Sequence, residues 1–339
     1  MAIDSSSASS GQIVAVTGAS GHLGANLVRA LVAAGRRVRA LVHQSSRGID
    51  GLPVEVMRVD VLDRASLDAA FRDVHTVFHL AAKISAGWER ESLIRAINVE
   101  GTRNVTAACL GARVQRLVHT SSIHAFAPGP GDGAIDESCR LAEARDLDCG
   151  AYGRAKAEGE RVVLAAVASG LHAVILNPTA ILGPFDFRGS AMGEVLRALA
   201  RGKLPALVAG ASYDFVDVRD VAAAALAAET RGRSGEHYLV PGTRLSLVEL
   251  GGLWAEVTGR PAPRWAAPMW LARVGAAFAP SWARLRGRRP LFTSESLLVL
   301  RDRHPISGRK AESELGHCPR PIAQTLRDTF AWMREAGWT

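Results

Sequence analysis

Short runs of β-branched and other apolar residues alternate, over the first half of the chain, with segments whose apolar residues recur every three or four positions. The short runs predict β-strands near residues 12–17, 37–42, 54–59, 76–80, 116–121 and 172–177. The three-to-four spacing predicts helices near residues 22–34, 64–72, 91–110 and 151–169. Such alternation is typical of a parallel sheet with helices on both faces, so we expect an α/β fold with a doubly wound parallel sheet.

The pattern changes near residue 178, where loops rich in glycine and proline separate scattered helices. A further strand, predicted near 236–240, is expected to rejoin the sheet. We therefore predict a disordered N-terminus and two structured parts. Residues 1–11 are expected to be disordered, and residues 12–177 are expected to form the sheet domain. Residues 178–339 are expected to form mainly a smaller C-terminal lobe that binds the substrate, with 216–240 returning to the sheet domain. The lobe is expected to use mainly residues 178–215 and 241–305.

A glycine-rich turn joins the first predicted strand to the first predicted helix. Residues 17–24 (TGASGHLG) follow the apolar run 13–16 and precede a helical pattern. Glycines in this context permit a tight turn and close approach of a pyrophosphate, and the helix N-terminus offers free N–H groups to phosphates. Their spacing differs from G-x-G-x-x-G, so a purely structural turn is the alternative. The expected cofactor-binding residues here are Thr17, Gly18, Ser20, Gly21, His22, Leu23 and Gly24.

Tyr152 and Lys156 form a pair of scarce residues, because the chain holds three tyrosines and four lysines. On a helix, positions four apart share a face, so the ammonium can lie beside the phenol. A nearby cation favours the phenolate and lowers a phenol pKa from its usual value of about 10. The pair is suited to reversible proton transfer to a carbonyl or carbinol oxygen. Two unrelated surface residues on a helix are the alternative.

Other motifs extend along most of the chain: residues 60–61 (DV), 79–82 (HLAA), 98–102 (NVEGT), 120–122 (TSS), 177–184 (NPTAILGP), 214–222 (DFVDVRDVA) and 309–316 (RKAESELG). With the glycine turn and the Tyr-x-x-x-Lys pair, their order and spacing resemble the extended short-chain dehydrogenase/reductases of the NAD-dependent epimerase/dehydratase superfamily. Within it, the chain is most similar to dihydroflavonol-4-reductases and 3β-hydroxysteroid dehydrogenases. The resemblance implies a Rossmann domain that binds NAD(P), a substrate-binding lobe, and a small-molecule substrate.

The resemblance also assigns positions along the cofactor. Asp60 and Val61 match the position that meets the adenine edge, although a strand-terminal aspartate can instead cap a helix, a role for which Asp63 competes. Lys83 either reaches phosphate or substrate, or faces solvent. The further cofactor-binding residues that the resemblance implies are Leu80, Ala81, Ala82, Lys83, Asn177, Pro178 and Ile181, with Tyr152 and Lys156.

Cofactor choice depends on the end of the second predicted strand. An acidic residue there favours NAD because it accepts hydrogen bonds from the adenosine ribose, yet residues 38–47 contain no carboxylate. Arginine suits a 2′-phosphate, and Arg39 matches a phosphate-binding arginine of dihydroflavonol-reductase-like members. We predict NADP as the cofactor, with NAD possible and with solvated arginines as the alternative. The residues expected around the phosphate are Arg39, His43, Ser45 and Arg47.

Ser122 matches the catalytic serine of the family, with Ser121 as the other candidate. Its hydroxyl is expected to hold the substrate oxygen while Tyr152 exchanges the proton, so the predicted catalytic residues are Ser122, Tyr152 and Lys156. Asn98 matches a family asparagine with either a structural or a proton-relay role. Asp217 and Asp220 are expected to cap a helix and brace the two parts of the chain rather than touch substrate.

The substrate class follows from what surrounds the serine. Dehydratases carry Thr-Asp-Glu after it, whereas Ile123 and His124 follow here, and Tyr213 stands where sugar-nucleotide binders place an arginine. We therefore expect an alcohol dehydrogenase or carbonyl reductase acting on a largely apolar small molecule that is steroid-, flavonoid- or polyketide-like. A nucleotide-sugar epimerase and a non-catalytic nucleotide-sensing module are the alternatives. The expected substrate residues are Ser122, His124, Phe126 and Phe185, and Phe187, Trp88 and Trp270 either line an apolar pocket or form core.

Charge and composition add limits. The net charge of +8 comes from dispersed arginines and accompanies no nucleic-acid motif, so no nucleic-acid partner is expected. The four cysteines show no metal-type spacing, and no apolar run predicts a membrane span or a secretory signal. An apolar segment at 270–278 beside Arg284, Arg286, Arg288 and Arg289 predicts a substrate lid or, alternatively, peripheral membrane contact. We expect a cytoplasmic monomer or homodimer without metal.

Overall fold

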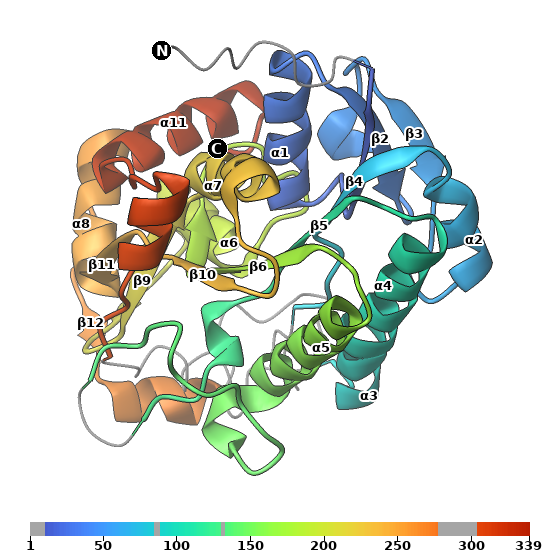
Figure 1. Cartoon of the computed structure of the whole chain (residues 1–339). Coiled ribbons are helices and arrows are strands. Elements are labelled where there is room, and N and C mark those ends of the chain that lie inside the picture. Colours follow the sequence, from blue (N-terminus) through green and yellow to red (C-terminus); the bar gives the residue numbers. More distant parts are fainter. Residues whose placement is uncertain (1–10, 85–88, 130–132, 277–303) are drawn as a thin grey trace, which may run out of the picture.

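Seven parallel strands form the central sheet of the computed structural model, which describes residues 11–84, 89–129, 133–276 and 304–339 (Figure 1). Their order is β10-β6-β5-β4-β1-β2-β3. They are β1 (Ile13–Thr17), β2 (Arg37–Val42), β3 (Glu55–Arg58), β4 (Val74–His79), β5 (Arg116–Thr120), β6 (Ala173–Pro178) and β10 (His237–Val240). All lie where the apolar runs predicted strands, so the α/β fold with a doubly wound parallel sheet is confirmed. The predicted disordered segment lies, up to residue 10, outside the described residues.

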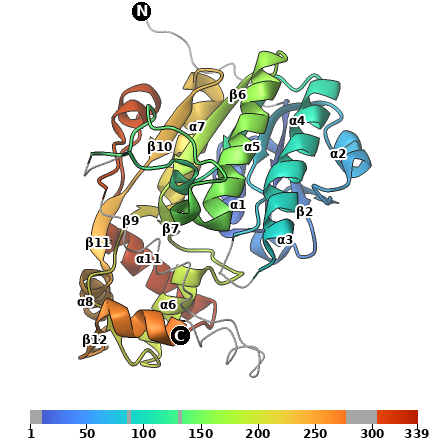
Figure 2. The ribbon, with the colours of Figure 1, turned by 90° about the horizontal axis from the view of Figure 1, so that it is seen from below.

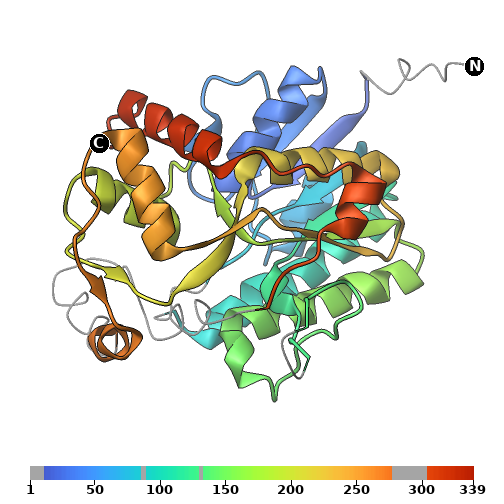
Figure 3. The same ribbon diagram turned by 90° about the vertical axis from the view of Figure 1, so that its left-hand side faces the viewer.

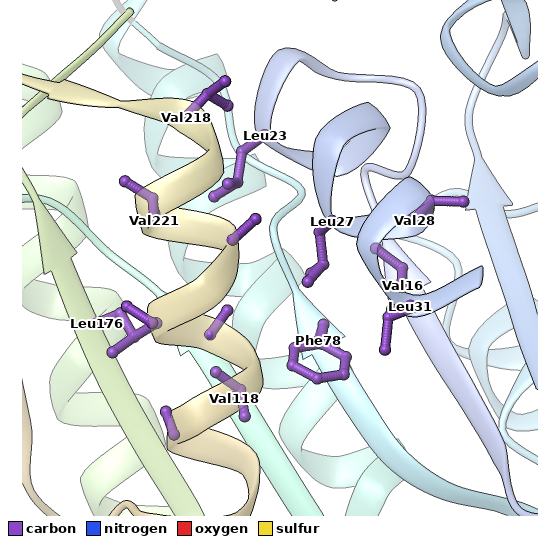
Figure 4. Close-up of a cluster of buried hydrophobic side chains, with 14 of the residues drawn as sticks. Val16, Leu23, Leu27, Val28, Leu31, Phe78, Val118, Leu176, Val218 and Val221 are labelled. Atoms are coloured by element: carbon purple, nitrogen blue, oxygen red, sulfur yellow. The ribbon is translucent and has the colours of Figure 1, made fainter. Parts of the chain in front are cut away.

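Helices cover both faces of this sheet, because the central strands β1, β2, β4, β5 and β6 carry apolar side chains on both sides. One face packs on α1 (His22–Ala33) and α7 (Val218–Arg231), where Leu23, Leu27 and Leu31 of α1 recur on the side that meets α7 (Figure 4). The other face packs on α2 (Arg64–Ala70), α4 (Gly101–Gly111) and α5 (Gly150–Ala168). Short 3₁₀ turns, η1 (Arg47–Ile49), η3 (Ile123–Ala125) and η4 (Leu147–Cys149), connect these elements.

The helix predicted over 91–110 is interrupted in the structure. It consists of α3 (Glu91–Arg95), a π-helical segment η2 (Ala96–Glu100) and α4. The wider turn places Asn98 so that its amide binds the chain after β4: Lys83 N–H donates to Asn98 Oδ1 (3.0 Å), and Asn98 Nδ2 donates to the Lys83 carbonyl (2.9 Å). A π segment inside a helix frequently marks a functional region. Asn98 therefore has the structural role that was one of its two predicted roles.

The second part of the chain forms a lobe with its own apolar core, which includes Phe215, Trp254 and Trp332. Figure 2 shows much of it grouped away from α2, α4 and α5, and Figure 3 shows α8 beside the C-terminal helix α11. Its strands are β7 (Ala180–Leu182), β8 (Leu207–Val208), β9 (Ser212–Asp217), β11 (Thr243–Ser246) and β12 (Ala266–Ala267). Its helices include α6 (Ala191–Ala200), α8 (Leu247–Thr258) and α11 (Ile322–Glu335).

Two segments of the second half return to the sheet domain. One is the predicted pair of α7 and β10; the other, not predicted, is η5 (Ala311–Leu315), whose Ala311 and Leu315 are buried in the core under α7. The apolar segment predicted as a lid lies, from residue 277 on, outside the described residues, and so do its four arginines. Within the part of the chain that the structure describes, no helix combines the length and the apolar character needed to cross a membrane.

An ionic network braces the lobe against the sheet domain, as predicted for Asp217 and Asp220. Asp217 caps α7 and pairs with Arg219 (2.7 Å), whose guanidinium also reaches Asp328 of α11 (2.7 Å). Asp220 pairs with Arg320, which precedes α11 (2.7 Å). Burial raises the pKa of the Asp217 carboxylate. The hydrogen bonds and charge of Arg219 outweigh burial and hold this pKa below its usual value.

Candidate active site

The candidate site lies at the carboxyl ends of the parallel strands, where β1 pairs with β2 on one side and with β4 on the other. At this point the chain connections turn to opposite sides of the sheet, and open α/β sheets bind ligands in the crevice beyond such a switch point. The register places Thr17 beside Leu41 and His79. The glycine turn, the loop after β4 and the serine motif after β5 therefore meet at one edge.

The glycine turn has the close packing that a phosphate cradle needs. Gly18 has φ +68°, and a Cβ there would lie 2.9 Å from the backbone nitrogen of Ala81. A Cβ on Gly24 would lie 2.8 Å from the Cα of Ala19 and closer still to the Gly18 carbonyl oxygen. The N-cap of α1, Gly21, makes no side-chain cap, and the first turn of α1 contains no acidic residue. These features fit a pyrophosphate held by backbone N–H groups at the helix N-terminus.

Two residues predicted to bind the cofactor have other roles for their side chains. Thr17 is buried, and its hydroxyl oxygen accepts the N–H groups of Leu80 and Ala81 (both 3.1 Å), which fixes the loop after β4. His22 directs its Nε2 to the carbonyls of Gly183 and Pro184 (3.1 and 3.2 Å). The Thr17 side chain thus positions the loop after β4, and the His22 ring ties α1 to the segment after β7; the binding of the cofactor by these two residues stays a prediction.

A buried histidine that the sequence reasoning missed completes the support for this loop. Thr17 Oγ1 lies 2.8 Å from His79 Nδ1, and His79 Nε2 lies 3.1 Å from Thr102 Oγ1. Thr102 in turn donates to the Asn98 carbonyl (2.8 Å). Burial, together with the charge of Lys156, lowers the pKa of His79 to about 3, so the ring is neutral. The signal was the HLAA motif itself, in which the histidine ends β4.

The structure brings the three predicted catalytic residues together. Ser122 follows β5, and Tyr152 and Lys156 lie one turn apart on α5. The Ser122 side chain lies close enough to the Tyr152 hydroxyl to favour its ionised form, against the larger effect of burial. The Lys156 ammonium is buried and donates to the Thr120 carbonyl (2.7 Å). Tyr152 thus meets Ser122 rather than the alternative candidate, Ser121.

A buried carboxylate lies behind this triad and was not foreseen. Glu160 is the next residue along the same face of α5, four positions after Lys156, and it is fully buried. Asn177 Nδ2 donates to Glu160 Oε1 (2.6 Å) and to the Ser122 carbonyl (3.1 Å). His237 Nδ1 lies 3.3 Å from Glu160 Oε2. Asn177 is itself fully buried, so its predicted contact with the cofactor is corrected to a scaffold role behind Ser122.

Burial dominates the electrostatics of the triad. It raises the pKa of Tyr152 to about 12, with Ser122 opposing the rise and Glu160 adding to it. Burial also lowers the pKa of Lys156 to about 8, against the attraction of Glu160. The expected lowering of the phenol pKa by Lys156 is not found: burial is the largest influence on this pKa, and the Lys156 ammonium is bound to the Thr120 carbonyl. The site therefore holds a neutral phenol, which is the form that donates a proton.

The adenosine end departs from prediction at Arg39. Arg39 is the third residue of β2, and its guanidinium donates to Glu55 (2.9 Å) and to the Ala70 and Arg72 carbonyls (both 2.8 Å). Those carbonyls precede β4, so they lie toward the amino-terminal edge of the sheet, away from the cradle. The predicted phosphate contact of Arg39 is wrong for this geometry. The exposed residues directly after β2 are the remaining candidates: His43, Ser45 and Arg47.

The other adenosine residues are placed as follows. Asp63, not Asp60, caps α2, and Asp60 accepts the Leu62 N–H (2.9 Å) while lying 3.6 Å from His43. A Cβ on Gly101 would lie 2.8 Å from Val61 Cγ2, so the Val61 side chain is packed inside. Asp60 thus stays available at the rim, close to the residues after β2.

The loop after β4 and the segment after β6 have the following geometry. Lys83 pairs with Glu89 (3.3 Å), so its charge is balanced. Pro178 is buried at the end of β6, whereas Ile181 in β7 is partly exposed.

Within the residues that the structure describes, no three His, Cys, Asp or Glu side chains are grouped so as to hold a metal ion.

The substrate end is only partly as predicted. His124 follows Ser122 in η3, and its Nε2 is hydrogen-bonded to the Tyr213 hydroxyl. Phe126 is 3% exposed and packs edge-on against His237, so it is core and its predicted substrate contact is corrected.

The partly exposed Phe185 has its ring under the Arg29 guanidinium (4.2 Å) and beside Trp332 (6.2 Å), and its substrate contact stays a prediction. Phe187 stacks with it. These aromatic residues join the lobe to α1. Trp270 is exposed, and Trp88 lies outside the described residues.

Comparison with known proteins agrees with this geometry. The family model described as NAD dependent epimerase/dehydratase family matches residues 14–240. Sterol demethylase protein B of Methylococcus capsulatus is 38% identical over 328 residues, which cover 95% of this chain and 98% of that protein. The 4-hydroxy-2-methyl-3-oxo-4-farnesyl-3,4-dihydroquinoline-1-oxide ketoreductase of Stigmatella aurantiaca is 32% identical, with coverage of 95% and 96%.

A solved structure extends the comparison. MoeE5 in complex with UDP-glucose and NAD is 27% identical, with a TM-score of 0.73 and coverage of 96% of this chain and 99% of that one. The family model spans most of the sheet domain, and the sequence relatives span nearly the whole chain. This protein therefore belongs to the NAD dependent epimerase/dehydratase family, within the extended short-chain dehydrogenase/reductases.

Proposed function

We propose that this protein is an NADP(H)-dependent oxidoreductase that interconverts a ketone and a secondary alcohol on a largely apolar small molecule. The observation that carries the proposal is the contact between the Tyr152 phenol and the Ser122 side chain, with the Lys156 ammonium one turn away on the same helix. A non-catalytic role is disfavoured because the catalytic tyrosine, serine and lysine are all present. A monomeric or homodimeric state and a cytoplasmic location remain predictions from the sequence.

The chain's own residues supply acid–base chemistry and positioning. The bound nicotinamide supplies or accepts the hydride. Ser122 holds the substrate oxygen, and Tyr152 donates its proton to that oxygen during reduction; its raised pKa keeps the phenol protonated at neutral pH before the transfer. Lys156 is fixed by the Thr120 carbonyl, and Thr17 and His79 fix the loop after β4 against which the cofactor lies.

The apolar nature of the substrate is supported by the wall of the site and by the relatives. Tyr213 stands where sugar-nucleotide binders have a diphosphate-clamping arginine, and it is hydrogen-bonded to His124 next to Ser122. An anionic diphosphate in a low-dielectric cleft needs a cationic partner. The names of two relatives specify a sterol and a farnesylated quinoline, both of which are largely apolar.

A nucleotide-sugar epimerase is the second candidate. It is favoured by the likeness to MoeE5, which was solved with UDP-glucose and NAD. Both functions use the same tyrosine and the same cofactor site, so they differ only in what the lobe binds.

A ligand panel separates the two functions. With NADP(H) or NAD(H) present, sterol and flavonoid ketones are expected to raise the melting temperature and to support cofactor oxidation, whereas UDP- and dTDP-sugars are not. The assay is thermal shift followed by absorbance of the reduced nicotinamide. Micromolar competitive inhibition by UDP, without turnover of any apolar ketone, would replace our proposal with the epimerase.

Cofactor preference gives a separate prediction. Arg47 is exposed directly after β2, where it can reach a 2′-phosphate. Arg47→Ala is therefore expected to weaken NADPH binding by about 1–3 kcal/mol, which is the range for a charged hydrogen bond left unmade. NADH binding is expected to weaken much less. Arg39→Ala is the matched control. Because its guanidinium serves Glu55 and two carbonyls, we expect it to lower stability without changing the preference. Titration of cofactor fluorescence measures both; equal losses for both cofactors in Arg47→Ala would exclude a 2′-phosphate contact.

A further inference from the structure

One arginine of the lobe reaches into the glycine turn of the sheet domain. Arg188 Nη2 donates to Ser20 Oγ at 3.3 Å, although the two residues are 168 positions apart in the chain. Ser20 is 4% exposed and lies in the middle of the cradle between Gly18 and Gly21. A Cβ on Gly48 would lie 2.9 Å from the Ser20 carbonyl oxygen, so Ser20 is also confined from the side of η1. The guanidinium therefore lies where a pyrophosphate would approach the loop.

The segment before Arg188 is fixed on helix α1. Asn26 Nδ2 donates to the Pro184 carbonyl (3.0 Å), next to the contact that the His22 ring makes with the same carbonyl. One turn further along α1, Arg29 lies over the Phe185 ring. Three successive turns of the helix that begins at the cradle thus hold the lobe segment that carries Arg188.

The backbone around Arg188 is fixed as well. Asp186 is 2% exposed, and its carboxylate accepts the Ser190 N–H (2.6 Å), while Gly189 N–H donates to the Asp186 carbonyl (3.2 Å). A Cβ on Gly193 would collide with the Asp186 carboxylate, so α6 starts directly against this turn. Arg188 is therefore presented by a tight turn that is anchored on both sides.

Among the residues that the structure describes, the Arg188 side chain donates to the neutral hydroxyl of Ser20 and forms no ion pair with a carboxylate. Arg29, the nearest cation on α1, instead donates to the carbonyls of Ala25 and Gly48 (2.8 and 2.7 Å). A guanidinium has five N–H donors and favours bidentate contact with phosphate, so Arg188 retains donors for an anion.

We propose that Arg188 binds the pyrophosphate of the nicotinamide cofactor from the lobe side, opposite the N–H groups of α1. The cofactor then joins the two parts of the chain, with α1 and the glycine turn below it and the Arg188 turn above it. This inference rests on the proposed function, because it requires that a nicotinamide dinucleotide occupies the cradle. It adds a cationic ligand that none of the sequence motifs contains.

The test compares dissociation constants of Arg188→Ala with wild type for four probes: NADPH, NADH, ADP-ribose and adenosine 2′-phosphate. We expect about 10–100-fold weaker binding of the first three, which carry the pyrophosphate, and no change for adenosine 2′-phosphate, which lacks it. Arg188→Lys is expected to lie between wild type and Arg188→Ala. Arg260→Ala, a loss of an exposed arginine of the lobe, is the matched control and should leave all four constants unchanged.

The outcomes separate the inference from the proposed function. Unchanged affinity of Arg188→Ala for NADPH, NADH and ADP-ribose overturns the inference and leaves the proposed function standing. A raised KM for the second substrate with unchanged cofactor affinity overturns it in favour of a substrate anion. If wild type binds neither NADPH nor NADH, both the inference and the proposed function are wrong. Should Arg188→Ala not fold, Arg188→Gln keeps the side-chain length and supplies the same measurement.

Discussion

Tyr152→Phe is expected to lower kcat by roughly 10²–10⁴ while leaving the dissociation constant for the cofactor nearly unchanged. The substitution removes only the hydroxyl that meets Ser122 and keeps the ring that fills the space. Because burial raises the pKa of this phenol to about 12, the hydroxyl keeps its proton throughout the usual assay range and acts as the donor in reduction.

The measurement is the initial rate of cofactor oxidation with an apolar ketone from the panel, together with cofactor titration. Tyr238→Phe is the matched control, because it also removes one phenol hydroxyl, one that donates to Glu314 (2.6 Å) beside β10 and away from Ser122. It should leave kcat unchanged. Near wild-type turnover by Tyr152→Phe would exclude this residue as the proton donor.

The fold was predictable because its signals are local. Each short apolar run forms one strand of the sheet, buried in all but the edge strand β3, and the glycine turn at 17–24 had to follow a strand and start a helix for its glycines to fit. The order of the strands then follows from right-handed crossovers between parallel strands. The same locality explains why Ser122, Tyr152 and Lys156 were found, since two share a helix face and the third ends a strand.

The errors concern side chains whose partners are distant in the chain. Arg39 could not be assigned from its strand alone, because what decides its role is the pair of carbonyls at Ala70 and Arg72. Asn177 likewise lies in a family motif, yet its amide is bound by Glu160, whose burial nothing local indicated. Arg188 is the reverse case: an exposed arginine without a motif that the lobe places at Ser20.

Aromatic residues were the least predictable. Phe126 and Phe185 follow the catalytic serine and the NPTAILGP motif, positions from which a pocket can be lined. Phe126 is buried in the core against His237. Phe185 has a positive φ of 65°, and its ring lies under the Arg29 guanidinium. Apolar side chains serve a core and a pocket equally well, so their sequence pattern does not separate the two.

A single methyl group at Gly24 should lower the stability of the protein strongly. Its Cβ would lie 2.8 Å from both the Cα and the carbonyl carbon of Ala19, and closer to the Gly18 carbonyl oxygen. Real Cβ atoms do not approach backbone atoms this closely, and no side-chain rotation relieves the contact. The first turn of α1 must then move away from β1, and with it the N–H groups that face the cradle.

Gly24→Ala is therefore expected to lower the free energy of unfolding by about 3 kcal/mol or more, which is at or above the usual range for overpacking. Cofactor binding is expected to weaken at least about tenfold. Urea unfolding and cofactor titration measure the two effects. Gly252→Ala is the matched control, because Gly252 lies inside α8 with open space around its Cβ position. Alanine there should stabilise by about 0.5–1 kcal/mol through helix propensity. A Gly24→Ala protein as stable as wild type, with unchanged cofactor affinity, would show that α1 does not pack on the turn as closely as this structure has it.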